Sequence, residues 1–266
     1  MNIDQNISLY FKENKYGNFC LIENDLISNF IKDNGHWEEH LCYFYSKIIK
    51  PDSIILDGGA NIGFHTIQFA YLANKGKVYA FEPQSLIYNV LSTNILINGF
   101  SDIVSQYRLG LSDKESTETF TSILNPGISG FGDTINEFCI NWGGRGFIEG
   151  DGDEEATTVT IDSFNIPKLD FIKLDIQGFE YKALLGGINT IKNNMPTIFI
   201  ENYDGRCSDD EEVKKRERDP IDWLLNLGYK GYRLLFGNGD DCIFTTDQDV
   251  ILLIENEKDI KIEIIK

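Results

Sequence analysis

The sequence has no apolar run long enough to cross a bilayer, and no basic start followed by the apolar core of a secretory signal. Its five cysteines include no C-x-x-C pair, and their odd number argues against a disulfide framework. Positive charge is also scarce: the net charge is −18, which would repel a nucleic-acid backbone. These absences predict a soluble cytoplasmic protein with reduced thiols, no membrane span and no nucleic-acid partner.

A buried strand, a glycine-rich turn and a helix are predicted in succession between residues 54 and 70. The run Ile54–Leu56 is continuously apolar, as in a parallel strand that is covered on both faces. In the turn that follows, Gly59 and Gly63 allow the backbone to approach a ligand and the next helix closely, and Asn61 is a residue that tolerates a positive φ. A cofactor is therefore expected over this turn.

Two nucleotide-binding patterns fail at the turn. The dinucleotide pattern G-x-G-x-x-G needs Gly where Asn61 stands, and a P-loop needs a Gly-Lys-Ser/Thr that the turn lacks. The remaining pattern, D-x-G-x-N-x-G, is followed about 20 residues later by Glu82 at the end of an apolar strand, where a carboxylate can accept both hydroxyls of a ribose. This spacing suits S-adenosylmethionine, with Gly59 leaving room for its methionine end. A generic glycine-rich turn followed by a chance acid is the alternative.

A second polar group follows the apolar strands nearer the C-terminus. Lys173 and Asp175 lie on one side of an apolar strand, near its carboxyl end, and Glu201 ends the strand that comes next. Ligands of open α/β sheets bind at this rim. Because an unpaired ammonium in a sheet interior is costly, Lys173 and Asp175 are either an ion pair that only stabilises the strand or part of a functional site.

The N-terminal segment is predicted to cover this core. Residues Leu9–Ser28 alternate around a Tyr-Gly-Asn turn, which predicts a β-hairpin, and Trp37–Lys50 has the pattern of an amphipathic helix. We expect residues 1–50 to form a hairpin and cover helix, and residues 51–266 to form the main domain.

Between the two polar groups, the chain is predicted to form one strand and one long irregular insert. The strand is expected over Ile103–Leu111 and leads into Ser112 and Asp113. The glycine-rich stretch Asn125–Gly152 is typical of a lid, a binding loop or a mobile insert.

Two weak metal patterns were weighed against simpler explanations. His36 and His40 have i, i+4 spacing but lack the H-E-x-x-H order, so surface or capping histidines are favoured. Asp151 and Asp153 match part of a calcium loop whose other positions are missing, so a solvated loop is favoured. No metal site is predicted.

The motifs taken together resemble the FkbM family of S-adenosylmethionine-dependent methyltransferases, within the class I methyltransferase fold. The resemblance extends over roughly residues 35–244, and its most specific element is K-x-D-x-x-G-x-E at Lys173–Glu180. The matching segments are Trp37-Glu38, Leu56–Gly63, Phe81-Glu82-Pro83, Leu111-Ser112-Asp113, Thr160–Ser163, Lys173–Glu180 and Leu227-Gly228-Tyr229. Gln177 stands where the family often has Glu.

The resemblance implies a Rossmann-like, doubly wound α/β fold with a seven-stranded mixed sheet in the order 3-2-1-4-5-7-6. It also implies methyl transfer, usually to a hydroxyl, in sugars, polyketides and other small-molecule or glycan acceptors. By position, the implied cofactor-binding residues are Glu38, Asp57, Gly59, Ala60, Asn61, Gly63, Glu82, Pro83, Ser112, Asp113 and Asp175. Glu82 would hold the ribose, Ser112 and Asp113 the adenine side, and Glu38 the amino group.

The catalytic assignment follows from the chemistry of the transfer. Methyl transfer from a sulfonium is an in-line displacement, and an alcohol acceptor must lose its proton during attack. Asp175, Glu201 and His65 are the candidate bases, in that order, and Lys173 would set the charge state of Asp175. Two other functions stay open: a cofactor- or glycan-binding module without catalysis, acting as a partner subunit, and an NAD enzyme, which Asn61 disfavours.

Overall fold

The computed structural model describes residues 7–120, 141–148, 154–202, 211–236 and 241–266. Asp151 and Asp153, and most of the expected insert, lie outside these residues. Within the described part of the chain, no helix combines the length and apolar character needed to cross a membrane.

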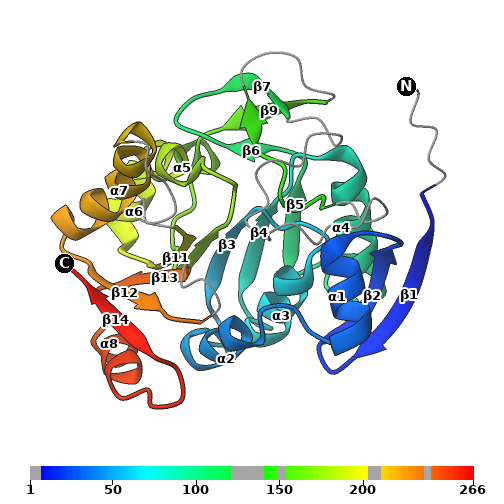
Figure 1. Ribbon diagram of the computed structural model, residues 1–266, viewed down its shortest axis with the longest axis horizontal. Helices are drawn as coiled ribbons and strands as arrows, with labels where there is room; N and C mark the ends of the chain where they lie inside the picture. The colour runs from blue at the N-terminus through cyan, green and yellow to red at the C-terminus, as the bar shows by residue number, and fades with distance from the viewer. Residues whose placement is uncertain (1–6, 121–140, 149–153, 203–210, 237–240) are drawn as a thin grey trace.

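The centre of the molecule is a mixed sheet of eight strands (Figure 1). Across the sheet the strands are β5 (Val104–Tyr107), β4 (Lys77–Phe81), β3 (Ile54–Gly58), β10 (Phe171–Leu174), β11 (Thr197–Glu201), β13 (Asp241–Thr245), β12 (Lys230–Leu234) and β14 (Ile262–Ile265). The first five are parallel, and the last three pair antiparallel with their neighbours. The expected order 3-2-1-4-5-7-6 is confirmed, and β14 is an eighth strand beyond the seven expected.

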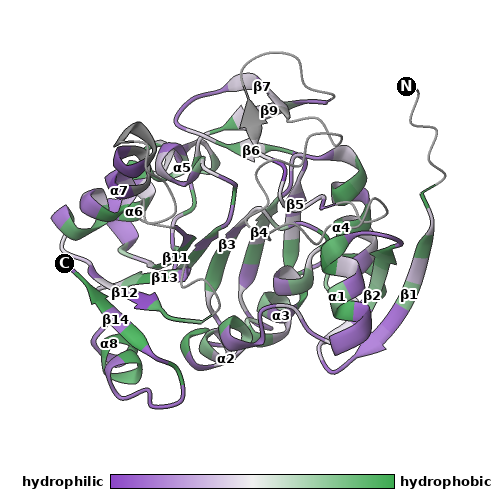
Figure 2. Cartoon of the chain, in the orientation of Figure 1, coloured by the Kyte–Doolittle hydropathy of each residue, from purple (hydrophilic) through white to green (hydrophobic). Residues whose placement is uncertain are grey.

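Helices cover both faces of this sheet. One face carries α2 (Glu39–Ile48), α3 (Phe64–Leu72), α4 (Ser85–Ile97) and α8 (Gln248–Glu255), and the other carries α5 (Glu180–Gly186), α6 (Ile188–Asn194) and α7 (Glu211–Asn226). Successive residues of a strand point to opposite faces, so Ile55 joins the first hydrophobic cluster and Leu56 joins the second. Figure 2 shows the resulting hydrophobic strands in the middle of the sheet. This double cover explains the continuous apolar run in the sequence.

The N-terminal hairpin is present, with β1 (Leu9–Asn14) antiparallel to β2 (Gly17–Ile22). It ends earlier than the prediction of Leu9–Ser28, because a short helix, α1 (Leu26–Asn34), begins within that span. Asp25 caps this helix by accepting a hydrogen bond from the Ser28 N–H at 2.8 Å. The division of the chain at residue 50 stays a prediction.

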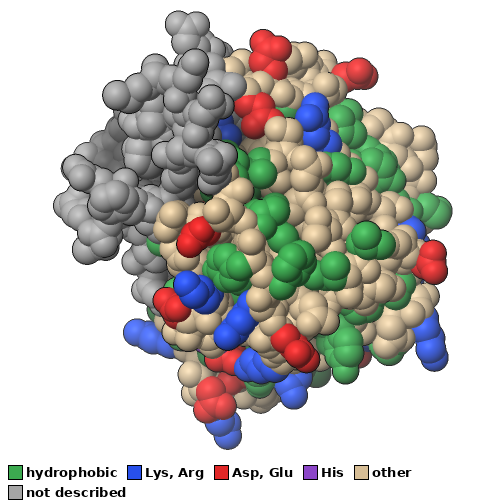
Figure 3. All heavy atoms as spheres, turned by 90° about the vertical axis from the view of Figure 1, so that its right-hand side faces the viewer, with side chains coloured by type: hydrophobic (Ala, Val, Ile, Leu, Met, Phe, Trp, Pro, Cys, Tyr) green, Lys and Arg blue, Asp and Glu red, His purple; other side chains and the backbone are tan. Residues whose placement is uncertain are grey.

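Asn94 of α4 ties the hairpin to the glycine-rich turn. Its side-chain amide accepts from the Cys20 N–H at 2.6 Å and donates to the carbonyl oxygens of Cys20 at 3.1 Å and Ile62 at 2.7 Å. The outer side of this layer faces solvent, where apolar and charged side chains are interspersed (Figure 3), and Phe11 and Leu96 are each 69% exposed. The hairpin therefore supports the turn from the inside while its outer face stays exposed.

A second, smaller sheet corrects one of the predicted strands. Its order is β6 (Gly110–Leu111), β9 (Glu155–Val159), β7 (Ser116–Phe120) and β8 (Phe147–Ile148). A single strand over Ile103–Leu111 is wrong, because the chain leaves the central sheet after Tyr107 and Gly110 pairs instead with Thr158. A short 3-10 helix, η1 (Ile161–Phe164), follows β9.

Candidate active site

A cavity of about 620 Å³ lies at the carboxyl ends of β3, β4, β10 and β11, bounded on its far side by α1 and the start of α2. This is the rim of an open α/β sheet at which ligands bind. Predicted site residues that line it are Glu38, Gly59, Ala60, Asn61, His65, Glu82, Pro83, Lys173, Asp175 and Glu201. The other predicted residues, Asp57, Gly63, Ser112 and Asp113, are not part of this lining.

Asp57 and Gly63 support the turn from outside the cavity. Asp57 is fully buried and its Oδ2 accepts a hydrogen bond from the Thr66 hydroxyl at 2.6 Å. Gly63 has a φ of 90°, and a Cβ there would lie 2.6 Å from Cδ1 of Leu91 on α4. Both residues are thus placed to hold the turn and α3 in position.

Ser112 and Asp113 lie beyond the cavity wall, on the side of α5. A Cβ at Gly186 of α5 would come within 2.0 Å of the Ser112 carbonyl oxygen, so the two backbones are in close contact. The cavity is lined instead by the preceding residues, Leu109 to Leu111. The assignment of Ser112 and Asp113 to the adenine stays a prediction.

The glycine-rich turn has the backbone geometry that its sequence predicts. Asn61 adopts a φ of 50°, and the N–H groups of Gly59 and Ala60 both donate to the Phe81 carbonyl oxygen, at 3.0 and 2.9 Å. Gly59 has a φ of 74°, and a Cβ there would lie 1.8 Å from the carbonyl oxygen of Asp175. The end of β10 is therefore packed directly against the turn, and glycine is required by this contact as well as by the conformation.

We expect Gly59→Ala to destabilise the protein and to abolish binding of the predicted cofactor. The left-handed conformation costs a non-glycine residue roughly 1–2 kcal/mol, and the clash with Asp175 adds to it. Gly99→Ala is a matched control, because Gly99 has a φ of 73° but no atom near its Cβ position. Thermal unfolding and titration with S-adenosylhomocysteine should show the larger loss only at Gly59; equal losses would contradict the packing argument.

Glu82 is held in the wall by two backbone donors. Its Oε2 accepts from the Asn61 N–H at 3.0 Å and its Oε1 accepts from the Gln84 N–H at 2.9 Å. Burial raises the pKa of this carboxyl to about 7, although these N–H groups act in the opposite direction. Each oxygen keeps a second lone pair, so the carboxylate can still accept hydrogen bonds from a ligand.

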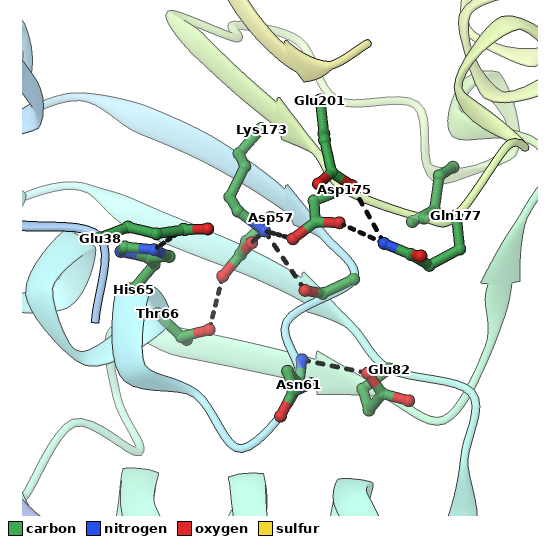
Figure 4. A network of polar contacts seen from close by, with 12 residues as sticks. Glu38, Asp57, Asn61, His65, Thr66, Glu82, Lys173, Asp175, Gln177 and Glu201 are labelled. Atoms are coloured by element: carbon green, nitrogen blue, oxygen red, sulfur yellow. Dashed lines mark hydrogen bonds and ion pairs between the residues drawn. The ribbon is translucent and has the colours of Figure 1, made fainter. Parts of the chain in front are cut away.

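Lys173 lies between two carboxylates. Its Nζ is 3.5 Å from Asp175 Oδ2 and 3.8 Å from Asp57 Oδ1, and it donates to the Gly59 carbonyl oxygen at 3.3 Å (Figure 4). Burial lowers the pKa of this ammonium, but Asp175 and Asp57 outweigh that effect and the net shift is upward. The buried Lys173 ammonium is therefore charged and paired with carboxylates. Lys173 and Asp175 also line the cavity.

Asp175 and Glu201 are joined by one glutamine amide. Gln177 Nε2 lies 3.0 Å from Asp175 Oδ1 and 3.0 Å from Glu201 Oε2 (Figure 4). Burial raises the pKa of the Asp175 carboxyl, but the Lys173 ammonium and hydrogen bonds with Glu201 and Gln177 together hold this pKa below its usual range. Asp175 is therefore an ionised carboxylate at neutral pH, with a carboxyl partner beside it.

Glu180, the last residue of the K-x-D-x-x-G-x-E element, holds the backbone of the loop that follows Asp175. Its Oε1 accepts from the Ile176 N–H at 2.9 Å and from the Gly178 N–H at 3.3 Å. These contacts fix the turn in which Gln177 has a φ of 54°. Burial raises the pKa of Glu180 to about 7. The last residue of the K-x-D-x-x-G-x-E element thus holds the loop that carries Asp175.

His65 is paired with Glu38 across the cavity wall. Its Nε2 lies 2.9 Å from Glu38 Oε2 (Figure 4). Burial lowers the pKa of this imidazole, but the Cys42 thiol and the Glu38 carboxylate raise it to about 10. An imidazolium has no lone pair with which to take a proton, so this geometry favours a role in holding Glu38.

Sequence reasoning missed two contacts in the wall. His40 Nε2 lies 2.7 Å from Asp241 Oδ2, and its ring stacks on Phe236 at 4.2 Å between centroids. Gln84 donates to the Trp142 carbonyl oxygen at 3.0 Å and accepts from Arg145 at 3.0 Å. The position of Gln84, two residues after Glu82, could have suggested a role in the same wall, whereas nothing in the sequence links His40 to Asp241.

Among the described residues no group of three or more His, Cys, Asp or Glu could hold a metal ion.

Comparison with known proteins identifies a matching family. The model of the methyltransferase FkbM domain matches residues 57–234. The chain is 27% identical over 190 residues to the AMB antimetabolite synthetase AmbE of Pseudomonas aeruginosa, covering 60% of this chain and 9% of AmbE. It is 34% identical over 89 residues to the methyltransferase sdnD of Sordaria araneosa, covering 33% of this chain and 34% of sdnD. The matches thus span about a third or less of each of these relatives.

A solved structure of another FkbM methyltransferase has a similar fold. The crystal structure of the methyltransferase FkbM from Methylobacillus flagellatus KT superimposes with a TM-score of 0.51 and 16% identity, over 76% of this chain and 47% of that chain. At this identity the likeness concerns the fold.

Proposed function

The chain belongs to the methyltransferase FkbM family, and from that premise we propose that it transfers a methyl group from S-adenosylmethionine to a hydroxyl of a carbohydrate, glycan or similar small molecule. The proposal of a hydroxyl acceptor rests on Asp175 and Glu201. These two carboxyls line the cavity and are both hydrogen-bonded to the Gln177 side-chain amide. An alcohol must lose its proton during attack, and an ionised carboxylate in the wall can take it.

In this proposal the cofactor occupies the side of the cavity formed by the glycine-rich turn and the end of β4. Glu82 accepts the ribose hydroxyls, and Gly59, Ala60, Asn61 and Pro83 border the nucleoside and methionine. Glu38, oriented by His65, receives the amino group. Asp57 and Gly63 act indirectly by holding the turn, and Ser112 and Asp113 support the segment at the adenine side.

The proposed transfer depends on charge and position. Lys173 favours the ionised form of Asp175, and the close packing of the Asp175 backbone against Gly59 places the residue beside the turn that would hold the methyl donor. Orienting an acceptor oxygen in line with the donor methyl supplies much of the acceleration of such a displacement. Asp175 is then the first candidate for the base, with Glu201 beside it.

Calorimetric titration tests the proposal against its alternatives. We expect binding of S-adenosylmethionine and S-adenosylhomocysteine and no binding of NAD, followed by transfer of labelled methyl groups to a hydroxylated fraction of a small-molecule extract. Binding of both compounds without transfer to any fraction would favour the module without catalysis. Binding of NAD alone would contradict the proposal.

Affinity for S-adenosylhomocysteine should rise as the pH increases. Burial raises the pKa of Glu82 to about 7, so the carboxyl is largely protonated at pH 6 and ionised at pH 8. Ribose hydroxyls donate to the ionised form, so binding should be about tenfold tighter at pH 8 than at pH 6. Calorimetry across this range measures the slope.

The matched variant for this slope is Glu82→Gln, which keeps the shape and removes the ionisation. Its affinity should be weaker and nearly independent of pH. Glu180, whose pKa is also raised to about 7, is present in both proteins and is outside the lining. A slope that persists in Glu82→Gln would therefore assign the pH dependence to another group.

A further inference from the structure

Residues 141–146 form a short segment, here called the strap, that runs along the wall of the cavity. All of its residues except Trp142 line the cavity, and the side chains of Trp142 and Arg145 are both buried. The guanidinium carbon of Arg145 lies 5.6 Å from the centre of the Trp142 ring, and the Trp142 N–H donates to Asp25 Oδ1 at 3.4 Å. The glycine-rich stretch of the sequence thus contributes a buried piece of the cavity wall.

The strap packs against both halves of the site. A Cβ at Gly143 would lie 2.6 Å from Ile27 Cδ1 on α1 and 2.8 Å from Asn61 Nδ2 in the glycine-rich turn. A Cβ at Gly146 would lie 3.0 Å from the Gln177 carbonyl oxygen, in the loop after β10. The strap therefore lies between α1, the turn and the loop that follows Asp175.

Gln84 joins the strap to the end of β4. Its Nε2 donates to the Trp142 carbonyl oxygen and its Oε1 accepts from Arg145 Nη1, both at 3.0 Å. Arg145 also lies 3.7 Å from Oε2 of Glu154, whose Oε1 accepts from the Ser85 N–H at 2.7 Å. Arg145 thus connects the strap to the start of α4 by two routes.

The strap contacts both of the residues that hold Glu82. The Asn61 N–H donates to one carboxylate oxygen of Glu82 (Figure 4), and the Gln84 N–H donates to the other. The strap packs beside the Asn61 side chain and binds the Gln84 side chain. Because the two N–H donors fix the direction of the remaining lone pairs of the carboxylate, displacing the strap would turn these lone pairs away from a ribose.

Resting on the proposed function, we infer that Arg145 is a positioning residue of the cofactor site. Through Gln84 it holds the strap against the glycine-rich turn, and the strap keeps Glu82 in the orientation that accepts the ribose hydroxyls. Arg145 therefore acts on the cofactor through Glu82 and not by direct contact.

Calorimetric titration with S-adenosylhomocysteine tests this inference without an acceptor. We expect Arg145→Met to bind about tenfold more weakly than the unaltered protein, because a hydrogen bond from a charged donor is lost. Arg218→Met removes the same charge from the ion pair with Asp222 on α7 and should bind normally. Equal affinity in Arg145→Met and the unaltered protein would overturn the inference and leave the proposed methyl transfer intact. Failure of the unaltered protein to bind would contradict the proposed function itself.

A double-variant cycle shows whether Arg145 acts through Glu82. In the Glu82→Gln background, Arg145→Met should weaken binding by about threefold or less, because the carboxylate that Arg145 positions is already absent. The full tenfold loss in that background would overturn the inference, since Arg145 would then contact the cofactor directly or act through general packing.

Gln84→Met tests the same link from its other end, and it does so even where Arg145→Met fails to fold. The variant keeps the backbone N–H that holds Glu82 and removes both side-chain contacts with the strap. We expect a similar loss of affinity for S-adenosylhomocysteine, with thermal unfolding of the same sample showing a folded protein. A folded Gln84→Met that binds as tightly as the unaltered protein would overturn the inference.

Discussion

Asp175→Asn should reduce methyl transfer by about 10²–10⁴ while the protein still folds and binds S-adenosylhomocysteine. The amide keeps the shape of the carboxylate and can still accept from Gln177, but it cannot take the acceptor proton. Lys173 keeps Asp57 as a partner, at 3.8 Å, so the ammonium is not left uncompensated. Single-turnover transfer of labelled methyl groups, with calorimetry on the same sample, measures both effects.

Asp222→Asn is the matched control, because it makes the same chemical change on the exposed face of α7. Its transfer rate and cofactor affinity should equal those of the unaltered protein. If Asp175→Asn is folded, binds the cofactor and transfers methyl groups at the normal rate, Asp175 is not the base, and Glu201 becomes the next residue to test.

Lys173→Met should lower the free energy of unfolding by about 3–5 kcal/mol, because it leaves the buried Asp57 and the adjoining Asp175 without their shared cation. Methionine fills much of the same volume, so the loss reports charge more than packing. Chemical denaturation of the variant and the unaltered protein measures the difference.

The double variant Lys173→Met with Asp57→Asn separates this explanation from a packing defect. Asp57 has no solvent exposure, so neutralising it removes the most costly unpaired charge, and we expect much of the lost stability to return. Losses that simply add in the double variant would show that Lys173 stabilises β10 by packing. Methyl transfer should remain low in either case, because Asp175 still lacks its ammonium.

The parts of the site that follow from the sequence are those set by local pattern and strand ends. The apolar run, two glycines and Asn61 specify the strand, turn and helix, because each backbone conformation has few compatible residues. Asp175 and Glu201 could be placed together since the ends of neighbouring parallel strands meet at one rim.

Contacts between distant segments could not be predicted in this way. His40 and Asp241 are 201 residues apart, and their meeting depends on how α2 and β13 pack on the finished sheet. The same limit applies to Gly110, which pairs with Thr158 only because β9 lies beside it. His40, which the sequence favoured as a surface or capping histidine, consequently lines the cavity instead.

Gly59 packs so closely against the Asp175 carbonyl that a larger side chain at Gly59 cannot be accommodated. Residues of the cavity wall outside this contact are less constrained. A substitution that disturbs this contact would shift the turn and the end of β10 relative to each other, so we expect it to alter the proposed cofactor site and the proposed base at the same time. Phe30 and Trp37, by contrast, come from the α1–α2 segment, which the sheet does not need for its hydrogen bonds. We therefore expect exchanges of side chains within residues 26–37 to change which molecules fit the cavity, while the turn and Asp175 keep their places.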